Sequence, residues 1–355
     1  MKLFNKLLLY LFLHLSLLNC TNHDPLTHFT SQQTEKIKPT MWIPLEDYGV
    51  LKPRVTIKYG DDYVIIDGTK ENVITCVNFS THKFVSGGNF GNGPNELNMI
   101  GQLRKVKEKL LINDISLQKI FEITIQDSSL LIKPYHDINY EKRLYFFDYL
   151  GDNVIAIGMF GDFWIGYINI FNNELLSKID FPKFEQTNHL KGTLKSSVYS
   201  SSRVSISPNE KKVVVATQDA GIITLIDIGE TELTAYRQII YYPPGFSVFE
   251  IEGGGGRKGV SIATPKDSKV GFCGVDCDDK YIYVLYSGRT FNSHSELTNH
   301  CEHLLIYDWN GNPIKRYILD IPMWSMKYDK EKNSIYGIAY NPEGGFIEYQ
   351  LKTAK

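Results

Sequence analysis

Hydrophobic and polar positions alternate over short segments along most of the chain, at the period of two that is typical of β-strands. These segments come in pairs joined by a short polar turn, whereas the 3.6-residue period of an amphipathic helix is almost absent. The clearest pairs are residues 109–113 with 119–123, 212–217 with 222–228, and 281–286 with 303–307. The pattern therefore predicts an all-β protein built from repeated hairpins.

Each pair is interpreted as the second and third strands of a four-stranded unit. A first strand is visible upstream at 204–208 and 270–275, and a fourth follows at 312–319. Six such units, each of about 50 residues, fit between Met41 and Leu351, a size near the upper end of common propeller repeats. We therefore predict a six-bladed β-propeller, with seven blades less favoured.

The last unit has only three strands of its own, at 324–328, 334–340 and 346–351. We predict that a segment at 42–45 supplies its missing outer strand and closes the ring. Closure of this kind removes the exposed strand edges that make an open sheet prone to aggregation.

The N-terminus has the pattern of a secretion leader. Lys2 and Lys6 precede an apolar run of 12 residues at 7–18, which is too short to span a bilayer and fits a signal peptide. The run ends in Leu17-Leu18-Asn19-Cys20, which resembles the lipobox of bacterial lipoproteins, although Asn19 is larger than the usual small residue. The resemblance implies acylation of Cys20, and the alternative is an ordinary signal peptide followed by a chance cysteine.

Three regions follow from these patterns: a lipoprotein signal peptide at 1–19, a flexible polar tether at 20–39 and a propeller domain at 40–355. The predicted location is the cell envelope, with the lipid anchored in the outer membrane. Asp24 is the one acidic residue close behind Cys20, so the choice between the periplasmic and the outer side stays open.

A glycine-rich turn at 87–97 precedes the first clear hairpin. We interpret it as a blade junction in which the glycines supply positive φ, Pro94 fixes a turn and Glu96 accepts hydrogen bonds from loop amides. The alternative is that the exposed amides form a nest for an anion.

The sequence Gly-x-Gly-Pro-x-Glu-Leu at 91–97, followed by one strand that ends at Asp114 and another that begins at Lys119, resembles the TolB-like six-bladed propeller lipoproteins of Bacteroidetes. More distantly it resembles NHL repeats. The resemblance implies a structural role at the blade junction for Gly91, Gly93, Pro94, Glu96 and Asp114. The later units lack this signature.

The net charge of −2 and the pI near 6.5 give no basic face for nucleic acid. The 22 tyrosines and 19 phenylalanines favour strands and aromatic-lined surfaces. Five aromatic side chains are candidates for a binding face, although each alone is better explained as core: Phe163, Trp164, Tyr242, Phe246 and Trp324.

No catalytic, cofactor-binding or metal-binding residue is assigned, because the chain has no Gly-x-Ser-x-Gly and no His-Glu-x-x-His. The run Gly253–Gly259 lacks the Gly-Lys-Ser/Thr ending of a phosphate loop and is interpreted as a flexible loop between blades. The insertion at 287–302 contains His294, His300 and Cys301. Their spacing matches no closed zinc motif, so a solvated loop is the preferred interpretation.

Four cysteines remain after Cys20, namely Cys76, Cys273, Cys277 and Cys301, and whether they form disulfides stays open. Cys273 and Cys301 lie on a first and a third strand, about 10 Å apart. A bond between them requires the intervening loop to curl inward, because ~7 Å is the limit for bridged Cα atoms.

The sequence thus predicts a lipid-anchored envelope propeller that binds or scaffolds a protein, peptide or glycan partner. The alternative is an envelope lyase or hydrolase with its site in the central channel. Charged side chains that converge on the channel from several blades would favour chemistry, and a broad aromatic or apolar face would favour binding.

Overall fold

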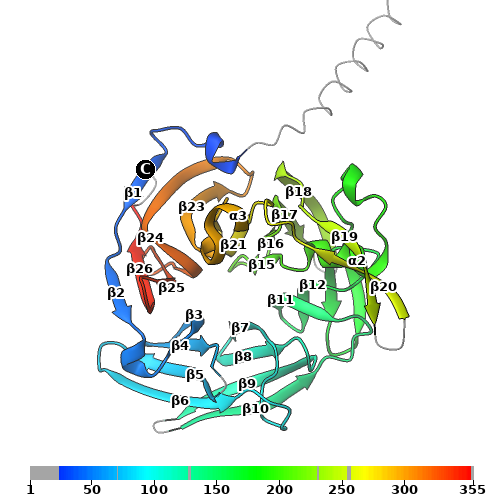
Figure 1. The fold of residues 1–355 in the computed structure, drawn as a ribbon. Helices are drawn as coiled ribbons and strands as arrows, with labels where there is room; N and C mark the ends of the chain where they lie inside the picture. The colour runs from blue at the N-terminus through cyan, green and yellow to red at the C-terminus, as the bar shows by residue number, and fades with distance from the viewer. Residues whose placement is uncertain (1–23, 70, 127–128, 230–231, 254–256, 353–355) are drawn as a thin grey trace, which may run out of the picture.

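The computed structural model describes residues 24–352 except 70, 127–128, 230–231 and 254–256, so the predicted signal peptide and Cys20 lie outside the described residues. Six blades stand around a common centre and form a disc (Figure 1). Four blades are separate four-stranded sheets, and the other two belong to one eight-stranded sheet. The prediction of an all-β propeller with six blades is confirmed.

Blades 1 to 4 are antiparallel sheets whose four strands are consecutive in the sequence. Blade 1 contains β3 (Pro53–Tyr59), β4 (Asp62–Asp67), β5 (Glu71–Asn78) and β6 (Lys83–Asn89). Blade 2 contains β7 (Ile100–Val106), β8 (Lys109–Asp114), β9 (Lys119–Gln126) and β10 (Ser129–Asp137). Blade 3 contains β11 (Leu144–Leu150), β12 (Asn153–Gly158), β13 (Ile165–Asn169) and β14 (Glu174–Ile179). Blade 4 contains β15 (Arg203–Ile206), β16 (Lys212–Ala216), β17 (Gly221–Ile228) and β18 (Leu233–Tyr242).

Blades 5 and 6 share one long strand. Blade 5 contains β21 (Phe272–Cys277), β22 (Tyr281–Tyr286), β23 (Cys301–Asp308) and the first half of β24 (Pro313–Asp329). The second half of β24 is the innermost strand of blade 6, which continues with β25 (Ser334–Tyr340) and β26 (Gly344–Gln350). The outer strand of blade 6 is β2 (Met41–Pro44), which pairs antiparallel with β26. The ring closure expected from residues 42–45 is therefore confirmed.

The predicted tether is wrong from Asp24 onward. A short 3-10 helix, η1 (Pro25–His28), precedes Phe29, whose side chain is buried against Tyr307 of blade 5. Strand β1 (Thr34–Ile37) then pairs in parallel with the outer edge of β24. These contacts cover an edge that would otherwise leave backbone groups unpaired, so the segment belongs to the propeller.

The core lies mainly between neighbouring blades, where strands with continuous apolar runs face one another. Three of the five aromatic candidates for a binding face, Phe163, Trp164 and Tyr242, are buried in this core. Phe246 packs against the same core cluster as Trp164. Trp324 is partly buried beside His300 and Tyr340.

The two faces of the disc differ. The face that we call the cavity face carries the turns between the first and second, and between the third and fourth, strands of each blade. The opposite face, called the hairpin face, carries the turns between the second and third strands and the connections from blade to blade. Short helices lie there: η2 (Glu46–Tyr48), η3 (Glu185–Thr187), α2 (Gly192–Tyr199), α3 (Phe291–His294) and η4 (Ser295–Asn299).

Two predicted loops on the hairpin face are ordered elements. Gly253 ends β19 (Ser247–Gly253), which pairs antiparallel with β20 (Arg257–Ala263) in a segment inserted between blades 4 and 5, and residues 254–256 of the predicted loop lie outside the described residues (Figure 1). Glycines in this segment interrupt the alternation of apolar and polar residues, so the sequence pattern did not predict these two strands. The insertion at 287–302 contains α3 and η4, and a capping box at Thr290 and Ser293 begins α3.

Candidate functional site

Each blade contributes one residue, near the end of its innermost strand, to the central channel. These equivalent residues line a cavity of about 380 Å³ on the cavity face: Ile57, Arg104, Asp148, Ser205, Asp276 and Lys327. Five of the six are polar or charged, so the channel brings together the kinds of side chain that a propeller enzyme uses.

Arg104 connects three blades. Its Nε donates to Asp148 Oδ1 at 3.1 Å, and its Nη2 donates to the carbonyl oxygen of Val204 at 2.9 Å. The second oxygen of Asp148 accepts the backbone N–H of Ile206 at 3.1 Å. Blades 2, 3 and 4 are thereby joined through one ion pair and two backbone groups.

Asp276 has the same role between blades 4, 5 and 6. Its carboxylate accepts the hydroxyl of Ser205 at 3.0 Å and the backbone N–H of Tyr328 at 2.9 Å. Lys327 Nζ lies 3.7 Å from it, and burial, with Arg104 nearby, lowers the pKa of Lys327. Both oxygens of each channel carboxylate are thus occupied within the protein, which fits a structural ring rather than a catalytic site.

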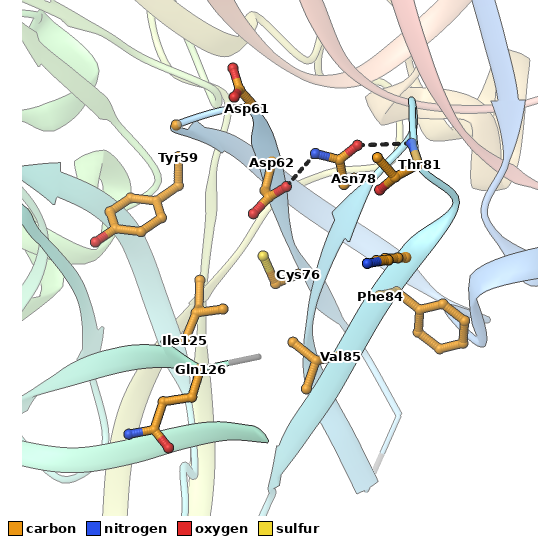
Figure 2. Close-up of a pocket in the computed structure, with 12 residues that line it drawn as sticks. Tyr59, Asp61, Asp62, Cys76, Asn78, Thr81, Phe84, Val85, Ile125 and Gln126 are labelled. Carbon is orange, nitrogen blue, oxygen red and sulfur yellow. Dashed lines mark hydrogen bonds between the residues drawn. The ribbon is translucent and has the colours of Figure 1, made fainter. Parts of the chain in front are cut away.

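A wider cleft opens on the cavity face between blades 1 and 2 (Figure 2). Its volume is about 570 Å³, and its walls come from the turn after β3, from β5 and β6, and from the end of β9. Asp62 lies near its centre and accepts a hydrogen bond from Asn78 at 2.7 Å. Asn78 in turn accepts the backbone N–H of Thr81 at 3.0 Å.

The floor of this cleft is apolar and chemically inert. It contains Cys76, Val85 and Ile125, and burial, followed by the charge of Asp62, raises the pKa of the Cys76 thiol to about 12. A thiol with this pKa is not a nucleophile at neutral pH. The rings of Tyr59 and Phe84 point away from the middle of the cleft (Figure 2).

A third cavity, of about 470 Å³, lies between the cleft and the channel. It shares Gly60 and Asp61 with the cleft, and Lys105 and Tyr328 with the channel cavity. The three cavities therefore adjoin, and we call them together the groove. Sequence analysis missed the groove, because its residues come from turns that are far apart in the chain.

The sequence profile described as "TolB-like 6-blade propeller-like" matches residues 36–330 of the chain. The protein belongs to this family. No curated protein matches the sequence.

Among solved structures, the TolB-like propeller is similar to a luciferin-regenerating enzyme, with a TM-score of 0.51 and 8% identity over 89% of this chain and 96% of that chain. It is also similar to Raptor from Chaetomium thermophilum, with a TM-score of 0.51 and 11% identity over 94% of this chain and 30% of that chain. Identities this low show the fold alone.

The junction residues of the TolB-like propeller lie on the hairpin face. Glu96 accepts the backbone N–H of Gly93 at 2.7 Å, and a Cβ atom at Gly91 would lie 2.0 Å from the Glu96 carboxylate. A side chain at Gly91 or Gly93 would displace the Glu96 carboxylate from this position. Of the glycines in the 87–97 turn, Gly88 supplies positive φ, at 77°, whereas Gly87, Gly91 and Gly93 do not. Pro94 is exposed in the same turn.

Asp114, another junction residue, is fully buried at the end of β8. Its carboxylate accepts the backbone N–H groups of Met99 at 3.0 Å and of Ser116 and Leu117 at 2.8 Å. Asp67 binds the connection before blade 1 in the same way. These acids hold the incoming chain against the blade, and none of them points into the groove.

The side chains of the 287–302 insertion that were considered for a metal site, His294, His300 and Cys301, line no part of the groove, whereas Cys76 and Cys277 line two of its cavities. Within the described ranges, Cys76, Cys273, Cys277 and Cys301 are free thiols, and no three His, Cys, Asp or Glu side chains are grouped as a metal site. Strand β22 ends at Tyr286, and the insertion that follows it brings Asn299 next to Cys273 before β23 begins at Cys301. The Cys273 thiol lies 3.9 Å from Asn299 Oδ1, the Cys301 thiol lies 3.7 Å from the carbonyl oxygen of Asn299, and the two thiols are neighbours.

None of the helices in the described part of the chain is both long and apolar enough to cross a bilayer.

Proposed function

We propose that this TolB-like propeller is a lipid-anchored protein of the cell envelope that binds a polypeptide partner in the groove on its cavity face. The anchor is an acylated Cys20, as its lipobox-like context suggests. The observation that supports binding is the continuity of three cavities across one face of the disc.

The chemistry of the groove favours a polypeptide over a glycan. Exposed side chains of both signs line it, including Asp61, Lys83 and Lys105, and such a mixture complements the charged side chains and backbone amides of a peptide. The two aromatic rings that line the cleft, those of Tyr59 and Phe84, point away from its middle (Figure 2), and the Tyr59 hydroxyl donates to the carbonyl oxygen of Glu108 at 3.0 Å, so neither ring is placed to stack on a sugar there.

The alternative function, an envelope lyase or hydrolase, depends on the channel. Asp148 and Asp276 would be its acids or bases, but each already accepts hydrogen bonds on both oxygens from neighbouring blades. A general base needs a free lone pair within reach of the substrate proton. Binding is therefore the better-supported proposal.

Membrane fractionation tests the anchor. The Cys20→Ser variant of the full chain should move from the membrane fraction to the soluble fraction. Cys76→Ser is the matched control, because it removes a buried thiol without touching the lipobox. Membrane association that persists in Cys20→Ser contradicts the proposed acylation.

Affinity purification from detergent-solubilised membranes tests the groove. The double variant Asp61→Lys, Lys105→Glu reverses two exposed charges there, whereas Lys133→Glu, Glu174→Lys reverses two exposed charges on outer strands of blades 2 and 3. We expect the polypeptides that are recovered with the wild type to be recovered also with Lys133→Glu, Glu174→Lys, and to be lost from Asp61→Lys, Lys105→Glu. Equal recovery with both variants contradicts binding in the groove.

A further inference from the structure

Large apolar side chains are exposed unevenly on the two faces. The described residues expose 16 such side chains. Only Phe84, at the start of β6, and Phe171, in the turn after β13, lie at the cavity face, and six others lie along the outer strands of blades. The remaining eight lie on the hairpin face: Leu51, Met99, Val248, Phe249, Ile251, Val260, Phe291 and Leu297. Six of these eight belong to two neighbouring insertions, the β19–β20 hairpin and the segment that contains α3 and η4. Grouped apolar exposure, unlike scattered single residues, is typical of an interaction site.

The β19–β20 hairpin exposes apolar side chains on both of its sides. It is a sheet of two strands that pairs with no described blade, and Ile262 near its base packs against the core. Side chains alternate along a strand, so Phe249 and Ile251 lie on the side turned away from that core. Their cross-strand partners, Ser261 and Gly259, are small and leave the two apolar side chains prominent.

The N-terminal end of the described chain lies beside this hairpin. Asp24 forms an ion pair with Lys269 at 3.3 Å, in the connection that follows β20. Cys20 is four residues before Asp24, and a fully extended chain of that length spans about 14 Å. Because Asp24 pairs with Lys269 and Pro25 directly after it is buried, this short length is the chain that separates the anchor from the disc.

The insertion that carries Phe291 contacts the same connection. The backbone N–H of Asn292 donates to the carbonyl oxygen of Lys266 at 3.0 Å, and that of Val270 donates to Arg289 at 2.8 Å. Lys266 and Lys269 are exposed here, where their charges can meet anionic headgroups.

We propose that the hairpin face of the propeller lies on the lipid bilayer, with Phe249, Ile251 and Phe291 inserted at the level of the headgroups. This inference rests on the proposed acylation of Cys20. The short reach from Cys20 to Asp24 selects lipid over a protein partner or a second copy as the occupant of this face. Apolar side chains at an interface add to the affinity that an acyl chain supplies, and the cavity face is then turned away from the membrane, where a partner can reach the groove.

Tryptophan quenching tests this orientation on the full-length lipoprotein. The protein is reconstituted into vesicles of phosphatidylethanolamine and phosphatidylglycerol with brominated acyl chains, which quench nearby indole fluorescence. Phe291→Trp reports on the hairpin face and Phe84→Trp on the cavity face, at positions that are 53% and 51% exposed. After subtraction of wild-type fluorescence, we expect the emission of Trp introduced at 291 to be quenched about twofold more than that at 84, as expected for interfacial insertion.

Equal quenching at the two positions, with the protein still in the floating vesicle fraction, overturns the orientation but leaves the anchor intact. Protein that fails to float with the vesicles shows instead that the acylation is wrong. Phe249→Trp is a second reporter on the hairpin face if Phe291→Trp does not fold. Unquenched emission at 249, together with crosslinked dimers or a crosslinked partner, overturns the assignment to lipid.

Discussion

The guanidinium of Arg104 and the carboxylate of Asp148 form an ion pair at 3.1 Å between blades 2 and 3, with both side chains largely shielded from water. Asp148→Ala removes the acceptor and leaves Arg104 buried beside Lys327, whose charge has the same sign. The free energy of unfolding should fall by about 3 kcal/mol, since a buried charge loses its partner. Urea denaturation measures this loss.

The double variant Arg104→Met, Asp148→Asn is the control, because it removes both charges and keeps the volumes close to those of the wild type. It should be more stable than Asp148→Ala. A single variant as stable as the wild type contradicts a structural role for the pair.

Gly345 and Trp42 are in contact where the ring closes. A Cβ atom at Gly345 would lie 2.6 Å from the Trp42 ring, so Gly345→Val pushes β2 away from β26. We expect a loss of about 2 kcal/mol in the free energy of unfolding, in a single transition. Thermal melting followed by circular dichroism measures it.

Adding Trp42→Ala to Gly345→Val should recover part of that stability, because the clash is removed. Two separate melting transitions, or no loss in Gly345→Val, would show that the β2–β26 contact does not hold the disc together.

Phe29 distinguishes an integral N-terminal segment from a tether. Its side chain is 7% exposed and contacts Tyr307 edge to face, with ring centroids 5.5 Å apart. Phe29→Ala should destabilise the propeller by about 3 kcal/mol, whereas Phe84→Ala, at an exposed position, should change stability by less than about 0.5 kcal/mol. Equal unfolding midpoints for the two variants in urea would restore the tether interpretation.

His303 makes stability depend on pH. Burial, followed by the charge of Arg316, lowers its pKa to about 4, whereas in the unfolded chain an ordinary value near ~6.5 is expected. Between these values the unfolded chain binds a proton that the folded chain does not. Stability is therefore complete above pH ~6.5 and falls as the pH drops toward 4, by up to about 3 kcal/mol.

Urea titrations at several pH values should show a flatter pH dependence for His303→Phe than for the wild type over this window. His294→Phe, at an exposed position in the insertion that precedes β23, is the control and should keep the wild-type slope. Parallel curves for all three proteins would contradict a neutral buried His303.

The period of two was enough to predict the blades and their closing strand. Segments such as 109–113 with 119–123 carry their own pairing information in apolar alternation and short turns. The closing strand was predicted by counting strands, because the last unit lacked one and residues 42–45 could supply it.

The groove could not be predicted in this way. Asp62, Lys105 and Tyr328 come from three different blades, and only the closed ring brings their turns together. The β19–β20 hairpin was missed for a local reason, since glycines at its end weaken the strand pattern. The segment containing Phe29 was mistaken for a tether because a single apolar residue in a polar stretch gives no periodicity.

Strand β2, which closes the ring, is synthesised near the beginning of the chain, and its partner β26 is the last strand to be synthesised. Thr40 donates a hydrogen bond to Glu348, 308 residues further along, so β2 must wait for almost the whole polypeptide before it can pair. A chain that lacks β26 during synthesis therefore has no complete disc, because β2 has no strand to pair with. Folding with contacts this distant in sequence is slow, and a truncation that removes β26 would leave β2 without its partner strand.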